Sequence, residues 1–198
     1  MEINESYLIE QYGPNLGSVR DIDLSYKKMT DYDSQIFEQL KKFGIDNLVK
    51  SLAPPESRLA KWKPKITSIH PQKFQKCSNL TFLEISENSL FEIDANLFSG
   101  LKNLQKLSLN KNEIYEIDSR CFCDLNNLTY LNLSVNRIEE VDSKWFEKLG
   151  NLRELELSDN LISRIDAKCF RGLDSEKIRM ITLNGNRRSF KSFVRDDF

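Results

Sequence analysis

A repeat of 24 residues, without insertions or deletions, occupies the middle of the chain. Residues 80–175 can be written as four aligned lines, LTFLEISENSLFEIDANLFSGLKN, LQKLSLNKNEIYEIDSRCFCDLNN, LTYLNLSVNRIEEVDSKWFEKLGN and LRELELSDNLISRIDAKCFRGLDS. Each line has apolar residues at the same seven positions and an asparagine at one further position. One such repeat cannot bury its own apolar residues, whereas stacked repeats bury a continuous core. The chain is therefore predicted to form a solenoid.

The apolar positions of each line predict one short strand. In the first line they are Leu80, Leu83, Ile85, Leu90, Ile93, Phe98 and Leu101, and they recur every 24 residues. The pair Leu83 and Ile85 alternates with period two, so one face of the strand is expected to point inward. Strands of successive repeats are expected to pair in parallel, about 4.8 Å apart.

Two polar columns are interpreted as structural. The asparagine column comprises Asn88, Asn112, Asn136 and Asn160, where the chain leaves each predicted strand. A buried amide at that point can donate to and accept from backbone groups of the neighbouring repeats. The aspartate column comprises Asp94, Asp118, Asp142 and Asp166, four residues before each phenylalanine. An aspartate at that position suits the cap of a short helical turn.

The pattern L-x-x-L-x-L-x-x-N-x-L resembles that of leucine-rich repeat proteins, in the 24-residue subclass with a phenylalanine in the second half of the repeat. The resemblance covers about two-thirds of the chain once degenerate repeats are counted. It implies an α/β fold: a right-handed solenoid with a short-stranded parallel sheet on its concave side and an irregular or short-helical convex side. It also implies a non-catalytic module that binds a protein partner.

Outside the four lines the pattern is less regular. Residues 1–18 are expected to be a lead-in or cap, and residues 19–198 a single repeat domain whose first coil is atypical. An irregular insertion of about residues 41–65 interrupts this domain. It is either a degenerate coil with a surface loop or a docking loop that exposes Trp62 between basic side chains. Residues 187–198 cannot complete a repeat and are expected to cap the core.

Composition argues against several classes of protein. The chain has 29 Lys and Arg and 30 Asp and Glu, a net charge of −1, which is unlike the basic excess of nucleic-acid-binding proteins. The chain has no run of 18 apolar residues, so no membrane span is predicted. Its first residues do not fit the pattern of a signal peptide. No suitable pair among the four cysteines is expected within bridging distance, so free thiols and a cytoplasmic location are predicted.

No catalytic centre, metal site or cofactor is predicted. His70 is the only histidine, and neither a nucleophile motif nor a phosphate-binding glycine loop occurs. Cys121, Cys123 and Cys169 lack the C-x-x-C spacing that is typical of zinc sites.

The residues between the inward-pointing leucines are predicted to form a partner-binding surface on the concave side. One column contains Phe82, Lys106, Tyr130, Glu154 and Met180, and the next contains Glu84, Asn132 and Glu156. Aromatic residues and methionine are typical anchors of protein interfaces. The glutamates make this surface more acidic than the whole chain, which predicts a partner with a basic segment. An ordinary solvated sheet face is the alternative, and Trp62 is a second candidate for partner binding.

Three functional hypotheses follow from these observations. The first is an intracellular adaptor or regulatory binder. The second is an extracellular recognition domain of the receptor or innate-immune type, in which the N-x-S/T sequons at Asn4, Asn79, Asn127 and Asn132 would accept glycans. The third is a regulatory region of a larger enzyme. The sequence predicts neither the identity of the partner nor the oligomeric state.

Overall fold

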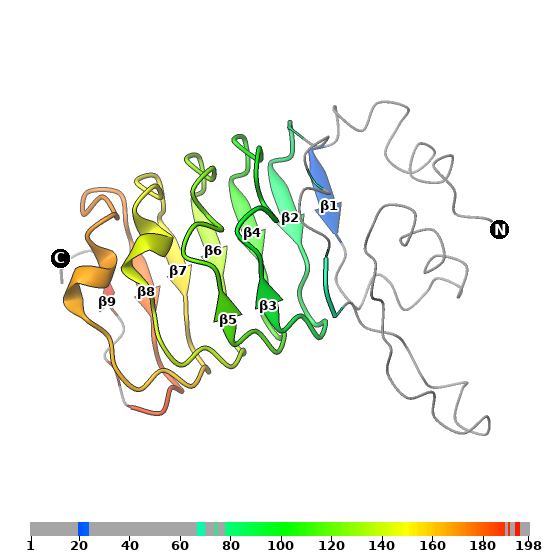
Figure 1. Cartoon of the computed structure of the whole chain (residues 1–198). Helices are drawn as coiled ribbons and strands as arrows, with labels where there is room; N and C mark the ends of the chain where they lie inside the picture. Colours follow the sequence, from blue (N-terminus) through cyan, green and yellow to red (C-terminus); the bar gives the residue numbers. More distant parts are fainter. Residues whose placement is uncertain are drawn as a thin grey trace, which may run out of the picture.

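The computed structural model describes residues 20–23, 67–69, 74, 78–188, 190 and 193–194 of the chain. Over these residues the chain winds into stacked coils (Figure 1). We number as coils 1 to 4 the four sequence repeats, residues 80–103, 104–127, 128–151 and 152–175. The predicted α/β solenoid is confirmed.

One strand from each coil enters a seven-stranded sheet of order β1-β2-β4-β6-β7-β8-β9. The strands are β1 Asp21–Asp23, β2 Phe82–Glu84, β4 Lys106–Ser108, β6 Tyr130–Asn132, β7 Glu154–Glu156, β8 Met180–Thr182 and β9 Phe193–Val194. The pairs from β1 to β8 are parallel, and β9 is antiparallel to β8. The leucine or isoleucine at the centre of β2, β4, β6, β7 and β8 is buried.

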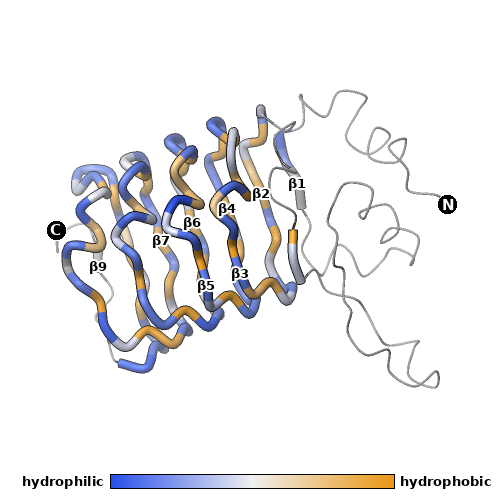
Figure 2. The backbone as a smooth tube through the Cα atoms, in the orientation of Figure 1, coloured by the Kyte–Doolittle hydropathy of each residue, from blue (hydrophilic) through white to orange (hydrophobic). Residues whose placement is uncertain are grey.

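The core consists of the predicted apolar columns. Leu83, Leu107 and Leu131 have no exposed surface, and the hydropathy colouring in Figure 2 shows apolar segments recurring at the same level of successive coils. On the convex side the rings of Phe98 and Phe122 stack with their centroids 6.0 Å apart. The column is less well covered in coil 4, where Phe170 and Leu173 are only partly buried. Burial of these side chains is the main favourable contribution to folding.

The asparagine column joins each coil to the preceding one. In coil 3, Asn136 Nδ2 donates to the carbonyl oxygens of Leu133 (3.0 Å) and of Leu109 in coil 2 (3.1 Å). Its Oδ1 accepts from the backbone N–H of Ile114, also in coil 2 (3.0 Å). Asn112 and Asn160 make the corresponding bonds. The predicted role of these buried amides is confirmed.

The aspartate column caps the convex turns. The side chain of Asp142 accepts from Lys144 N at the start of η3 (Ser143–Phe146), and that of Asp166 accepts from Lys168 N at the start of η4 (Ala167–Phe170). In coils 1 and 2 the corresponding aspartates make the same bond within a turn. A second, two-stranded parallel sheet pairs β3 (Glu92–Ile93) with β5 (Glu116–Ile117).

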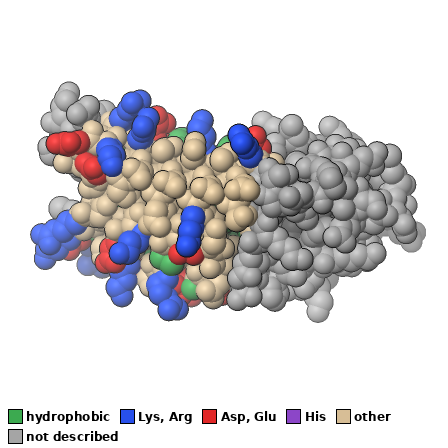
Figure 3. All heavy atoms as spheres, turned by 90° about the horizontal axis from the view of Figure 1, so that it is seen from above, with side chains coloured by type: hydrophobic (Ala, Val, Ile, Leu, Met, Phe, Trp, Pro, Cys, Tyr) green, Lys and Arg blue, Asp and Glu red, His purple; other side chains and the backbone are tan. Residues whose placement is uncertain are grey.

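The edge at which the strands begin is held by a second set of amides. Asn103, Asn127 and Asn151 each donate to a backbone carbonyl of the preceding coil, at 2.8–2.9 Å. Figure 3 looks onto this edge: uncharged side chains and backbone form much of its surface, with charged side chains among and around them. These amides therefore join successive coils at this edge.

Both departures from the 24-residue spacing leave the sheet intact. β1 pairs directly with β2, with Asp21 opposite Phe82. After coil 4, two additional residues are accommodated in a turn where Ile178 N donates to Asp174 O, and Glu154 remains opposite Met180. Phe190 packs against the core beside β9.

Several predicted segments lie outside the described residues: the lead-in 1–18, the insertion 41–65 with Trp62, and part of the C-terminal segment 187–198. Among the helices of the described residues, none is long and apolar enough to cross a membrane.

Replacement of Asn136 by alanine is expected to lower the free energy of unfolding by roughly 2–4 kcal/mol, because the buried N–H of Ile114 and its neighbours lose their partner. Urea denaturation measures this loss. Asn126→Ala, which removes an exposed amide in coil 2, is the matched control and should leave the midpoint unchanged. Equal midpoints for the two variants would contradict a structural role of the asparagine column.

Candidate functional site

The sheet presents two rows of side chains on its concave face. The first row is Phe82, Lys106, Tyr130, Glu154 and Met180, one from each of five adjacent strands. The second row is Glu84, Ser108, Asn132, Glu156 and Thr182. The structure thus brings together eight of the nine residues predicted for partner binding, and Trp62 lies outside the described residues.

The two rows are not uniformly exposed. Lys106 is exposed, whereas Phe82, Tyr130, Glu154 and Met180 are half-buried by their neighbours. Ser108 in the second row is only 5% exposed, and its hydroxyl donates to Asn110 Oδ1. Coil 2 therefore contributes one exposed and one buried side chain to the two rows.

Tyr130 is held in place by a local hydrogen-bond network. Asn132 Nδ2 donates to the Tyr130 hydroxyl oxygen at 3.0 Å. The Oδ1 of the same amide accepts from the backbone N–H and the hydroxyl of Ser134, at 2.9 and 2.7 Å. With its amide oriented in this way, Asn132 positions the ring of Tyr130 in the centre of the face before any partner arrives.

Carboxylates surround Tyr130. Burial raises the pKa of its phenol, and the negative charges of Glu156, Glu154 and Glu84 raise that pKa further, while the hydrogen bond from Asn132 acts in the opposite direction. Glu156 accepts a hydrogen bond from the Thr182 hydroxyl. Within the described part of the chain, none of these three carboxylates forms a salt bridge. Their charge is therefore left to a ligand or to solvent.

A column of residues in the left-handed backbone conformation borders the face where the strands end. Glu87, Lys111, Val135 and Asp159 have φ between 55° and 60°, and the column ends in Gly185 with φ 73°. A β-branched residue with positive φ is strained, and Val135 is also 42% exposed. The sequence analysis did not predict this strain. The only sign of the positive φ in the sequence is that each of these residues directly precedes an asparagine of the column. Val135 thus adds an exposed apolar side chain to this border in coil 3, the coil that contains Tyr130.

The thiols do not supply a reactive centre on this face. Cys121, Cys123 and Cys169 are free; Cys121 and Cys169 are buried in the convex half of the coils. Burial raises the pKa of both buried thiols, which keeps them protonated. Among the described residues there is no group of three His, Cys, Asp or Glu side chains that could hold a metal ion.

The parallel concave sheet, the buried asparagine ladder and the capped convex turns define a leucine-rich repeat protein. Residues 61–193 match the family described as BspA type leucine rich repeat region, in six copies, and the chain belongs to this family. Leucine-rich repeats typically act as non-catalytic interaction modules. No match was found among curated proteins.

The fold is shared with many solved structures, with 216 matching chains, so the architecture alone does not select a partner. One match is a chain in "Crystal structure of TLR13-ssRNA13 complex", with 31% sequence identity and a TM-score of 0.60. The alignment covers 64% of the present chain and 18% of that chain. The present chain thus corresponds to a small part of that protein.

Val135→Asn is expected to raise the free energy of unfolding by about 1 kcal/mol, because asparagine adopts positive φ with less strain. The midpoint of urea denaturation is the measurement. Val135→Thr retains the branch at Cβ and should give no increase. A Val135→Asn protein no more stable than the wild type would show that the strain is absent.

Proposed function

We propose that this chain is a non-catalytic recognition module that binds a basic segment of a protein partner on its concave face. The observation that supports this most directly is the half-buried Tyr130, fixed by Asn132 and surrounded by Glu84, Glu154 and Glu156 without a compensating salt bridge in the described residues. An aromatic anchor within a negative field suits an arginine or lysine side chain, whose apolar stem packs on the ring and whose charge meets carboxylates.

The dimensions of the face suit an extended segment. Five strands about 4.8 Å apart span about 19 Å, the length of roughly six extended residues. A segment that crosses the strands would meet Phe82, Lys106, Tyr130, Glu154 and Met180 in turn. Lys106 is the one cation in this row, so an acidic or polar residue of the partner belongs opposite it and sets the register.

The same charges disfavour phosphate groups. Three carboxylates around the central anchor would repel a polyanion, and Lys106 alone does not offset them. The TLR13 structure is a complex with ssRNA13, but we propose no RNA ligand for the concave face of the present chain.

For the cellular setting we propose an intracellular adaptor or regulatory binder. The free state of Cys121, Cys123 and Cys169 supports a reducing compartment. The likeness to a TLR13 chain is compatible with the alternative, an extracellular recognition domain, and a regulatory region of a larger enzyme is the third hypothesis. The concave face would bind a basic segment in any of these settings.

Neutralising the concave carboxylates is expected to weaken binding of the partner at least tenfold. Glu84→Gln/Glu154→Gln is compared with the matched control Glu147→Gln/Glu176→Gln, which removes two exposed carboxylates elsewhere. The measurement is quantitative affinity purification at low and moderate salt, because screening reduces the electrostatic part of the interaction. Phe82→Ala/Tyr130→Ala should have the same effect, with a melting temperature close to that of the wild type. Partners retained equally by all four proteins would place the binding surface elsewhere.

Thiol titration in denaturant tests the proposed compartment. Protein isolated from its native source should show four free thiols, the number of cysteines in the chain. A disulfide, or added glycan mass at Asn79, Asn127 or Asn132, would support the extracellular alternative instead.

A further inference from the structure

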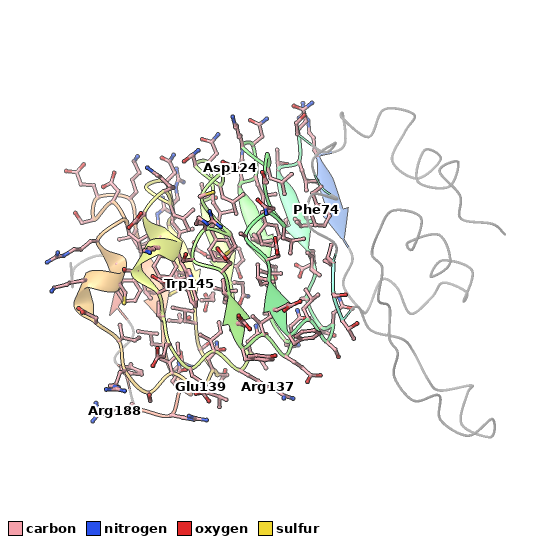
Figure 4. All side chains as sticks on the ribbon, in the orientation of Figure 1. Phe74, Asp124, Arg137, Glu139, Trp145 and Arg188 are labelled. Carbon is pink, nitrogen blue, oxygen red and sulfur yellow. The ribbon has the colours of Figure 1, made fainter. Side chains whose placement is uncertain are left out.

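A groove of about 730 Å³ opens on the opposite side of the coils from the concave face. One wall is the β5 segment of coil 2, with Tyr115, Glu116 and Ile117. Glu139, Glu140, Val141, Asp142 and Trp145 of coil 3 also line it, together with Arg137 and Leu161. In Figure 4, Trp145 lies in η3, and Arg137 and Glu139 lie below it on the flank that carries β5.

The groove lies where a hydrogen-bonded ladder stops. Between coils 1 and 2, β3 pairs with β5, and Asp118 N donates to Ile93 O at 2.9 Å. In the described structure no backbone hydrogen bond joins residues 115–118 of coil 2 to residues 139–142 of coil 3. Trp145 occupies the column in which the other coils have Leu97, Cys121 and Cys169, so the bulkiest side chain of the column stands beside this gap.

The charges in the groove are unequally paired. Arg137 pairs with Glu113 at 2.7 Å, and Glu139 pairs with Arg187 at 3.0 Å. Glu116 and Glu140 form no salt bridge in the described part of the molecule. Glu116 also lies directly opposite Glu92 in the parallel register, a like-charge pair that opposes folding. A cation in the groove would relieve this repulsion.

The aromatic residues supply the apolar part of the site. Tyr115 is 58% exposed and stacks on Phe91, with ring centroids 6.2 Å apart. These two rings and Val135 are the exposed large hydrophobic side chains of the described residues. Of the two rings, Tyr115 lines the groove, and its exposed ring offers a face to a planar cation.

Trp145 provides an independent indication of a ligand. Its side chain is almost completely buried, yet its Nε1 is the one buried side-chain nitrogen or oxygen of the described residues without a hydrogen-bond partner. Buried indole N–H groups ordinarily find an acceptor, and leaving one unpaired costs about 1–3 kcal/mol. This unpaired donor belongs to a residue that lines the groove.

From these observations we propose that the groove between coils 2 and 3 is a second binding site, which takes an arginine side chain from an exposed segment of a protein partner. The guanidinium group lies against Tyr115 and between Glu116 and Glu140. The Trp145 indole, whose Nε1 is buried in the free protein, turns toward the groove on binding, and a backbone carbonyl of the same segment then accepts from Nε1. This site is separate from the concave face and does not depend on it. It gives the chain two cation-selective surfaces on opposite sides of the coils.

Titration of isotopically labelled full-length protein with the peptide acetyl-Gly-Arg-Gly-amide, followed by NMR, tests the site. The Trp145 indole N–H resonance, assigned by its loss in Trp145→Phe, is expected to shift saturably and downfield as the N–H gains an acceptor. A peptide with citrulline in place of arginine keeps the shape and lacks the charge, and it should bind at least tenfold more weakly.

Variants separate this proposal from the concave site. Glu116→Gln/Glu140→Gln should weaken the peptide at least tenfold at the Trp145 resonance, whereas the control Glu147→Gln/Glu176→Gln and the concave variant Glu84→Gln/Glu154→Gln should not. Equal shifts with the arginine and citrulline peptides would overturn the proposal. So would an unmoved Trp145 resonance, even if amides around Tyr130 respond.

Discussion

The whole fold depends on one constraint: a coil of 24 residues can bury its leucines and satisfy its backbone only with help from its neighbours. The buried amides of Asn112, Asn136 and Asn160 express this constraint most clearly, because each satisfies backbone groups of two coils at once. A coil removed from the stack would expose its apolar face and leave polar groups unpaired. The stability of each coil therefore depends on its neighbours. The side chains of the concave surface are not part of the buried core, so their sequence is free to vary.

The gap-free repeat was sufficient to predict the sheet, its register and the roles of both polar columns, since each depends on period and spacing. It was also sufficient to place Phe82, Lys106, Tyr130 and Glu154 in one row. Features that are peculiar to a single coil were not predictable in the same way. Examples are the burial of Ser108, the strain at Val135 and the groove beside Trp145. Each occurs where one coil departs from the average of its neighbours, and a repeat pattern describes only the average.

The two proposed surfaces use the same chemistry in different settings. On the concave face the carboxylates gather around an aromatic ring that is already held by a neighbouring amide. On the convex side they line a gap between coils, next to a buried indole that lacks an acceptor. The first surface is pre-organised, whereas the second retains an unsatisfied group in the free protein. Part of the free energy of binding at the second site would therefore come from giving the unpaired indole N–H of Trp145 an acceptor.

The turn after coil 4 shows that the number of residues in a coil can change while the register of the strands stays the same. Two additional residues are taken up between Asp174 and Ile178, yet Glu154 and Met180 still face each other across the sheet. The direct pairing of β1 with β2 across a far longer stretch of chain shows the same independence. Strand alignment is enforced locally by inter-strand hydrogen bonds, so outer bends can lengthen or shorten during evolution without disturbing the inner rows. Diversification of such a protein can thus proceed on the two sides at different rates.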